Sequence, residues 1–328
     1  MSLFSGLDDA FLKVVDPSTA GDPDQDTALW TNLSRPQIAH ELLLLGFRVS
    51  VPVVAQLLKR HHLGRRKACK TLPLGHHACR NRQFEIIANY RAAFMHSPDP
   101  IISVDTKHKE FLGLLFRIGR LYTRHAQKAL DHDFPSAALG VIYPHGFYDI
   151  KRNLGHLNLG LSHDTSRFAC DSIAYWWETH GRPAYPDARR MLLLCDGGGS
   201  NASNRYVFKY HLERLADRIG LEVRMAHYPP YCSKYNAIEH RLFPHVTRAC
   251  QGLLLTSLEV AVKAMAKTAT KKGLKTTVHV LPGDYPLKEG YPDEYRETMK
   301  IRFDHELPTW NYRAIPCHSN EMGQLINF

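Results

Sequence analysis

The sequence lacks the features that mark most membrane and secreted proteins. No stretch reaches the roughly 18 uncharged apolar residues that a transmembrane helix needs. The N-terminus has no basic start before an apolar run, so it does not resemble a secretory signal. The seven cysteines include no CxxC pair, which argues against a disulfide framework or a zinc ribbon, and the His- and Cys-rich segment 61–79 matches no closed tetrahedral zinc pattern. These absences favour a reducing cytoplasm.

Acidic residues are also in short supply. The chain of 328 residues has 42 Lys and Arg against 32 Asp and Glu, with 20 His in addition. A basic balance of this size points to a polyanionic partner, and nucleic acid is the first candidate. A merely basic soluble protein is the alternative. The length suits one large domain or two modest ones.

The N-terminal part predicts a helix-turn-helix. Ser34 and Ser50 are suitable N-cap residues for two short helices, and Gly46 ends the first. The second helix, about residues 51–60, would lie in the major groove, and the basic linker 64–83 would follow phosphates. An ordinary helical hairpin is the alternative. The basic side chains expected to contact DNA here are Lys59, Arg60, Arg65, Arg66 and Lys67.

From residue 100 onward, the order of elements is that of a ribonuclease H-like domain. Strands are expected at 100–107, 139–149, 154–162, 191–196 and 221–226, with an irregular insertion at 110–135. Helices are expected after the caps Asp164 and Thr165, with Gly181 just beyond the end, at 205–219 and around 239. We therefore expect an α/β fold with a mixed five-stranded sheet flanked by helices, preceded by the small helical domain. The first and fourth strands would then lie side by side.

Three acidic residues should converge in such a fold. Asp105 ends the first strand, Asp196 ends the fourth, and Glu239 lies on the last helix. Each has a simpler reading alone, because Asp196 could cap a helix and Glu239 could be a solvated surface acid. Together, three carboxylates suit two Mg²⁺ ions in phosphodiester transfer. Our hypothesis is that Asp105 bridges the ions while Asp196 and Glu239 each hold one.

Other polar side chains near these acids could contact DNA. Lys107 and Lys234 could meet phosphates, and Asn201, after the glycines, could hold the DNA backbone. Asp164 could be an outer carboxylate, but a role as helix N-cap already explains it. The aromatic loop 228–231 could stack on a splayed base, although packing is the commoner fate.

The motifs ISVDTKHKEFLG, LLLCDGGGSNASNRY and HYPPYCSKYNAIEHRLFPHV resemble the Rhodopirellula-type DDE transposases of bacterial insertion sequences. The resemblance runs from about Trp30 to the WNY at Trp310. It implies a ribonuclease H-like domain that cuts DNA and joins it to a target, with the family's triad at Asp105, Asp196 and Glu239. It also implies two Mg²⁺ ions (with Mn²⁺ able to substitute), double-stranded DNA as transposon ends and target, a homo-oligomer on DNA, and a place at the bacterial nucleoid.

Two departures from the family pattern leave alternatives open. Related chains carry more DNA-binding sequence ahead of the helix-turn-helix, and SKYN at 233–236 replaces a more basic approach to the glutamate. A shortened copy that only binds DNA, or a nuclease without strand transfer, are therefore the rival functions. The expected parts are an N-terminal segment (1–30), the helix-turn-helix region with its linker (31–98), the catalytic domain (99–255) and a C-terminal extension (256–328) that starts with a helix over 258–272.

Overall fold

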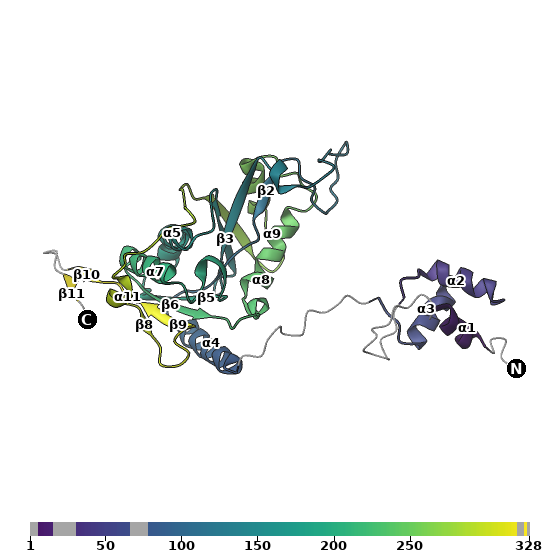
Figure 1. The fold of residues 1–328 in the computed structure, drawn as a ribbon, viewed down its shortest axis with the longest axis horizontal. Helices are drawn as coiled ribbons and strands as arrows, with labels where there is room; N and C mark the ends of the chain where they lie inside the picture. Colours follow the sequence, from purple (N-terminus) through teal and green to yellow (C-terminus); the bar gives the residue numbers. More distant parts are fainter. Residues whose placement is uncertain (1–5, 16–30, 66–77, 320–324, 327–328) are drawn as a thin grey trace. The chain divides into compact units, whose positions relative to one another are not determined.

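The computed structural model describes residues 6–15, 31–65, 78–319 and 325–326. The chain forms two compact units, Met1–Leu72 and Pro73–Phe328 (Figure 1). Arg66 and Lys67, two of the expected DNA contacts, lie outside the described residues. No helix in the described ranges is both long and apolar enough to span a membrane.

The first unit is a small helical domain with a core of its own. It contains α1 (Leu7–Val15), α2 (Arg35–Leu44) and α3 (Val51–Arg60). As predicted, Ser34 begins the first of the expected helix pair, and Ser34 N donates to Gln37 Oε1 at 2.8 Å in a capping box. Gly46 has a φ of +89°, which suits glycine and turns the chain towards α3. Apolar side chains from all three helices form the core: Phe11, Ile38, Leu42, Val54 and Leu57.

The second unit is built on one mixed sheet. Its strands are β1 (Ile101–Thr106), β2 (Glu110–Leu112), β3 (Gly140–Asp149), β4 (Leu154–Gly160), β5 (Arg190–Cys195), β6 (Glu222–His227), β7 (Lys275–Val280), β8 (Arg302–Phe303) and β9 (Asn311–Ala314). The order is β7-β4-β3-β1-β5-β6-β9-β8, with β2 paired to β3. A separate pair, β10 (His318–Ser319) and β11 (Leu325–Ile326), lies near the C-terminus.

The centre of this sheet has the expected ribonuclease H-like arrangement. The five predicted strands are β4, β3, β1, β5 and β6 in spatial order. β3 is antiparallel to both β4 and β1, whereas β1, β5 and β6 run parallel. The carboxyl ends of the parallel strands therefore meet at one edge of the sheet.

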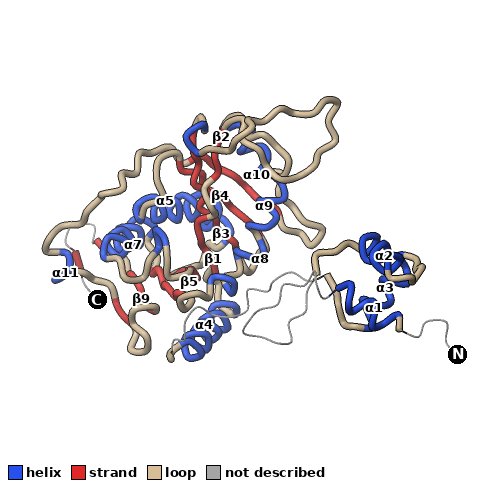
Figure 2. Tube along the Cα trace, turned by 45° about the vertical axis from the view of Figure 1, so that its right-hand side comes forward, coloured by secondary structure: helices blue, strands red, loops and turns tan. Residues whose placement is uncertain are grey.

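Helices cover both faces of the sheet (Figures 1 and 2). The main ones are α4 (Arg80–Met95), α5 (Ser166–Trp176), α7 (Tyr206–Ile219), α8 (Ile238–Arg241), α9 (Phe243–Ala249) and α10 (Leu258–Ala266), with the short α6 (Arg182–Ala184) and α11 (Tyr295–Thr298). α5 and α7 pack on one face, and α4, α8, α9 and α10 pack on the other. Successive side chains of β1 point to opposite faces of the sheet. Ile102 therefore packs in the core under α5 and α7, whereas Ile101 packs in the core under α4.

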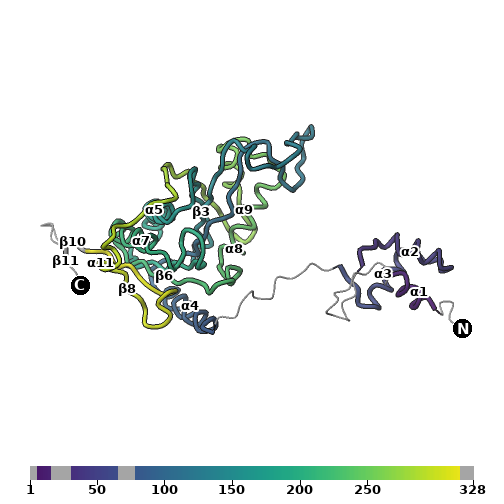
Figure 3. The backbone as a smooth tube through the Cα atoms, viewed as in Figure 1, coloured from purple at the N-terminus to yellow at the C-terminus, as the bar shows by residue number. Residues whose placement is uncertain are grey.

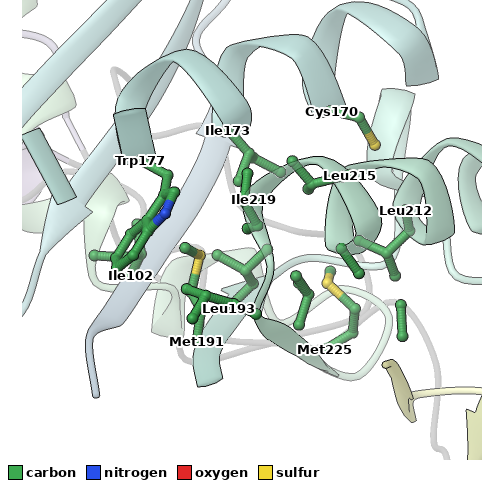
Figure 4. Close-up of a cluster of buried hydrophobic side chains, with 14 of the residues drawn as sticks. Ile102, Cys170, Ile173, Trp177, Met191, Leu193, Leu212, Leu215, Ile219 and Met225 are labelled. Atoms are coloured by element: carbon green, nitrogen blue, oxygen red, sulfur yellow. The ribbon is translucent and has the colours of Figure 1, made fainter. Parts of the chain in front are cut away.

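The core beneath α5 and α7 holds the central strands in register. Figure 4 shows Ile102, Met191, Leu193 and Met225 from the sheet beside Ile173, Leu212, Leu215 and Ile219 from the helices. Each of these side chains is buried. At roughly 1.5–3 kcal/mol per buried side chain, this layer is a major source of stability.

The segment between β2 and β3 is largely irregular, as expected for an insertion, and extends away from the sheet (Figure 3). β2 itself was not anticipated. Several large side chains of the insertion are open to solvent, including Phe116, Ile118 and Tyr122.

Two predicted helices differ in length from those observed. Gly181 does not follow the end of its helix but lies in a π-helical turn, Trp177–Gly181, that continues α5 into α6. A Cβ at Gly181 would lie 2.4 Å from the Trp177 ring, so glycine is required there. The helix expected over 258–272 ends at Ala266, and Gly273 then adopts a φ of +92° in the turn before β7.

The predicted division of the chain also needs correction. α4 was assigned to the DNA-binding region that ends at residue 98, but the structure places it in the second unit, where Ile87 and Phe94 pack against Ile101 and Leu192.

The C-terminal part is more than an extension packed on the domain. It supplies β7 beside β4 and β9 beside β6, so the expected five-stranded sheet has nine strands in the described chain.

Candidate functional site

The parallel pairing of β1 and β5 brings two of the predicted acids to the same sheet edge. Ser103 is in register with Leu194, and Asp105 and Asp196 each follow two residues later. Both carboxylates line a cavity of about 400 Å³. The glycine-rich turn after β5 forms another wall of this cavity, through Gly198 and Gly199. The convergence that the fold demanded of these two residues is therefore present.

The third acid, Glu239, is brought to β1 by a buried polar anchor. Asn236 Nδ2 donates to Val104 O at 3.1 Å, and Ile238 N donates to Ser103 Oγ at 2.9 Å. Asn236 and Ser103 are fully buried and also hydrogen-bond one another. Because Ser103 and Asp105 share one face of β1, this anchor directs the first turn of α8, with Glu239, to the Asp105 side of the strand.

A glycine on β3 allows the α8–α9 segment to approach so closely. Gly146 pairs with Asp105 in the antiparallel register of β1 and β3. A Cβ at Gly146 would lie 2.5 Å from the Phe243 ring and 2.8 Å from Ile238 Cδ1. Any larger residue would push α8 and α9 away from the sheet, and Glu239 with them.

The carboxylates interact strongly. Burial, the charge of Asp196 and a hydrogen bond to Glu239 raise the pKa of Asp105 to about 9. Burial also raises the pKa of Asp196, against a weak hydrogen bond from Gly198 N. The crowding and burial of these carboxyl groups therefore disfavour the charged forms of Asp105 and Asp196, which a nearby cation would favour.

The donor atoms fit a hard divalent cation. Carboxylate oxygens are the ligands that Mg²⁺ and Mn²⁺ prefer, and crowded negative charge in a partly buried cavity is what such an ion neutralises. Within the described residues, no group of three or more His, Cys, Asp or Glu side chains is arranged so that it could hold a metal ion. Asp105 is the common member, because it interacts with both Asp196 and Glu239.

A fourth carboxylate, Asp164, lies in the same cavity. The sequence favoured it as the N-cap of α5, but the cap is Thr165, whose side chain accepts from Phe168 N at 3.2 Å. Asp164 instead accepts a hydrogen bond from Thr106 Oγ1 at 3.2 Å. Burial, together with the charge of Asp196, raises its pKa above the usual range. The sequence analysis weighed an outer carboxylate at this position and preferred the cap, which the structure gives to Thr165.

A buried network supports the backbone at Asp196. His227 Nδ1 lies 2.9 Å from Asp196 O, and His227 Nε2 lies 2.8 Å from Tyr312 Oη. Burial lowers the pKa of His227 to about 4, so the ring is neutral and donates from Nδ1 to the carbonyl. Gln83 on α4 donates to His227 O at 2.9 Å and exchanges hydrogen bonds with Asn311. Segments from both ends of the second unit thus brace the site.

The expected DNA contacts fall into two groups. Lys107 and Asn201 line the cavity, and Lys234 is exposed on the loop before Glu239. Lys107 is paired with the buried Glu110, whereas the Asn201 Oδ1 atom is buried without a hydrogen bond among the described residues. The others, Lys59, Arg60 and Arg65, are exposed on the first unit, where Arg60 forms a 2.8 Å ion pair with Asp8 of α1.

A larger cavity, of about 790 Å³, lies away from the acids between α5, α7 and residues 289–292. Its charged side chains are paired with one another, since Arg167 contacts Asp171 at 3.7 Å and Glu289 at 3.3 Å. Because these side chains already pair with one another, they connect neighbouring elements and leave little unpaired charge to bind an ionic ligand.

The sequence matches the family described as Rhodopirellula transposase DDE domain over residues 10–316. Among curated proteins, none matches it significantly. Solved structures with some similarity include the Mos1 transposase paired-end complex with left transposon end, with 18% identity over 78% of this chain and 68% of that chain and a TM-score of 0.44. The Mos1 strand transfer complex has 18% identity, the same two coverages and a TM-score of 0.43.

Proposed function

Because the chain belongs to the family of Rhodopirellula transposase DDE domains, and is thus a metal-dependent insertion-sequence transposase, we propose that Asp105, Asp196 and Glu239 are its catalytic triad. One observation carries this proposal. Three acids that lie far apart in the sequence come from β1, the end of β5 and α8 and act on one another through Asp105. Buried carboxyl groups with pKa values raised by burial and by one another, beside a cavity, are typical of functional sites.

The roles of the three acids follow from their positions. Asp105, between the other two, would hold cations together with both of them, and Asp196 and Glu239 would each supply a carboxylate ligand to one cation. When bound, a pair of Mg²⁺ ions, for which Mn²⁺ can substitute, supplies charge stabilisation at the attacking and leaving oxygens of the phosphodiester. Asn236 keeps Glu239 in register with Asp105, and the glycines after β5 leave room for the DNA backbone.

DNA binding extends beyond the triad in this proposal. Lys107, Asn201 and Lys234 contact phosphates near the cleaved bond, and the first unit, through Lys59, Arg60, Arg65, Arg66 and Lys67, holds the transposon end. The partners are double-stranded transposon ends and target DNA. The active species is a homo-oligomer on DNA, at the bacterial nucleoid.

The test is cleavage of labelled DNA that carries the ends of the element in the presence of Mg²⁺. We expect Asp196→Asn to lower the cleavage rate roughly a thousandfold or more, because the variant keeps the shape of the side chain and loses its charge. Asp187→Asn, on an exposed loop, is the matched control and should cleave normally. Full activity in Asp196→Asn would refute the assignment of the triad.

The same assay addresses the two rival functions. Cutting followed by joining to a target is expected of a transposase. Cutting without joining would indicate a nuclease, and binding without cutting would indicate a copy that has lost its chemistry.

A further inference from the structure

The loop between β6 and the helix of Glu239 holds a tyrosine in an unfavourable conformation. Cys232 N donates to Pro229 O at 3.1 Å, which closes a turn around Pro230 and Tyr231. Tyr231 has a φ of +61°, in the left-handed region that a bulky side chain avoids. The second central position of a turn with proline at the first prefers glycine when φ is positive. A tyrosine therefore occupies a position suited to glycine.

Nothing in the described fold compensates for this strain. Tyr231 is 66% exposed, whereas Tyr228 in the same loop is 2% exposed. The nearby Tyr235 packs edge-on against Phe84, with ring centroids 4.9 Å apart. Within the described residues, the Tyr231 side chain has no hydrogen bond and no ring contact. Because the turn leaves the ring mostly in solvent, packing does not explain the positive φ of Tyr231.

The loop that carries Tyr231 is fixed to the active site at both ends. Tyr228 N donates to Cys195 O at 2.8 Å, directly before Asp196. At the other end, Asn236 is tied to Val104 of β1, and Glu239 follows three residues later. Lys234, on the same loop, is exposed and carries a positive charge. An exposed aromatic ring and an exposed cation, whose ammonium lies 5.2 Å from the centre of the Tyr235 ring, thus share the loop that leads to Glu239.

We propose that Tyr231 is a stacking platform for an unpaired nucleobase of the DNA substrate, with Lys234 contacting a neighbouring phosphate. The proposal rests on the proposed function, because it takes DNA as the substrate. Bases inside a duplex have both faces covered, so a free aromatic ring fits a base that is extruded or lies at a strand end. Strain of this kind, kept at a site without an internal benefit, is a mark of function. Stacking does not depend on the identity of the base, because every base has an aromatic face.

The test uses the full-length protein without divalent cation and a DNA duplex with a single-stranded tail that carries 2-aminopurine. Stacking on Tyr231 should quench the fluorescence of this base. We expect Tyr231→Ala and Tyr231→Gly to abolish the quenching and to weaken binding of this probe about tenfold. Tyr231→Phe keeps the ring and should stay within about twofold of the wild type. The same duplex with 2-aminopurine paired should bind all four proteins equally.

The glycine variant separates stacking from a structural role. Because glycine tolerates the positive φ, Tyr231→Gly should keep or raise the thermal midpoint while it loses the quenching. Leu307→Gly is the matched control, since Leu307 also has a positive φ, of +49°, but lies in the turn before β9. It should leave the quenching unchanged.

Quenching by Tyr231→Gly equal to that of the wild type would overturn the stacking proposal. Absence of quenching by the wild type would overturn it too. Neither result bears on the triad proposal. That proposal is tested separately, by Mg²⁺-dependent cleavage and its loss in Asp196→Asn. A wild-type protein that cleaves without quenching would thus reject the platform alone.

Discussion

Asp164 lines the same cavity as Asp105 and Asp196, two of the three proposed metal ligands. Thr106 links it to the triad, because its hydroxyl donates to Asp164 while its backbone N donates to Asp105 Oδ1 at 2.8 Å. Asp164 therefore helps to orient Asp105 and adds to the potential that attracts a cation. A residue of this kind acts through its neighbours, so its loss should weaken catalysis without abolishing it.

We expect Asp164→Asn to slow cleavage about tenfold at limiting Mg²⁺, the size of effect typical of side chains that orient metal ligands. The measurement is the single-turnover rate as a function of Mg²⁺ concentration. Higher Mg²⁺ should recover part of the rate, since the variant loses attraction for the cation and retains the triad.

Thr106→Val provides the companion variant for Asp164. It removes the hydroxyl that bonds Asp164 while it keeps the backbone N–H that bonds Asp105. It should produce a smaller effect in the same direction. A rate for Asp164→Asn equal to that of the wild type at every Mg²⁺ concentration would rule out this role.

At the scale of elements, the junction of β1 and α8 sets the geometry of the site. Asn236 and Ser103 form its buried hydrogen bonds, and both partners lie on backbone that carries an acid. Loss of either leaves buried polar groups unsatisfied, which typically costs about 1–3 kcal/mol. The position of Glu239 relative to Asp105 should suffer at the same time.

A double-mutant cycle tests this junction. We expect Asn236→Ala and Ser103→Ala each to lower the free energy of unfolding by about 1–3 kcal/mol, and the double variant to lose less than the sum, because the two side chains share a bond. Asn236→Ala should also slow cleavage while Asn204→Ala, at an exposed position, should not. Additive losses of stability, with cleavage unchanged, would show that the junction does not position Glu239.

The sequence was sufficient for the central strands and for the meeting of Asp105 and Asp196 at one edge of the sheet. Each strand of the centre is a short apolar run that ends at a turn, and the ribonuclease H-like order then dictates which strand ends meet. The sequence did not predict the buried hydrogen bonds of Asn236, because its local sequence indicates only a turn residue. The importance of Asn236 depends on Ser103, a residue far away in the sequence, and such a pairing leaves no local pattern.

The outer strands were harder to foresee for a related reason. β9 is only four residues long, Asn311–Ala314, and pairs with β6 in the antiparallel sense. A short edge strand has no strong periodicity, so its partner is decided by the tertiary fold. The polar tail nevertheless delivers Tyr312 and Asn311 to the network behind Asp196. The sequence analysis, which expected only a C-terminal extension here, did not predict this supporting role.

At the scale of the whole molecule, two units have separate cores. The first core uses side chains from α1, α2 and α3, and the cores of the second unit use the sheet and its helices. α4 belongs with the second unit because Gln83 is completely buried there and bonded to Asn311. Its helical pattern follows the helix-turn-helix so closely in sequence that composition alone could not separate them.

Separate cores predict two unfolding transitions in calorimetry of the full chain. Leu42, in the first core, and Leu212, in the second, are both completely buried. Leu42→Ala should destabilise the first unit by about 2–5 kcal/mol, and Leu212→Ala should do the same to the second. Each variant should therefore shift one transition and leave the other in place.

The control for this experiment is Leu43→Ala, because Leu43 is 47% exposed and its truncation leaves no cavity. It should move neither transition. The functional consequence can be read in the same variants: Leu42→Ala, heated until its first transition is complete, should lose binding to transposon ends, while far-ultraviolet circular dichroism still reports the folded sheet of the second unit. A single transition that both leucine variants shift equally would mean that the two cores unfold as one, and that the helical unit depends on the catalytic unit for its stability.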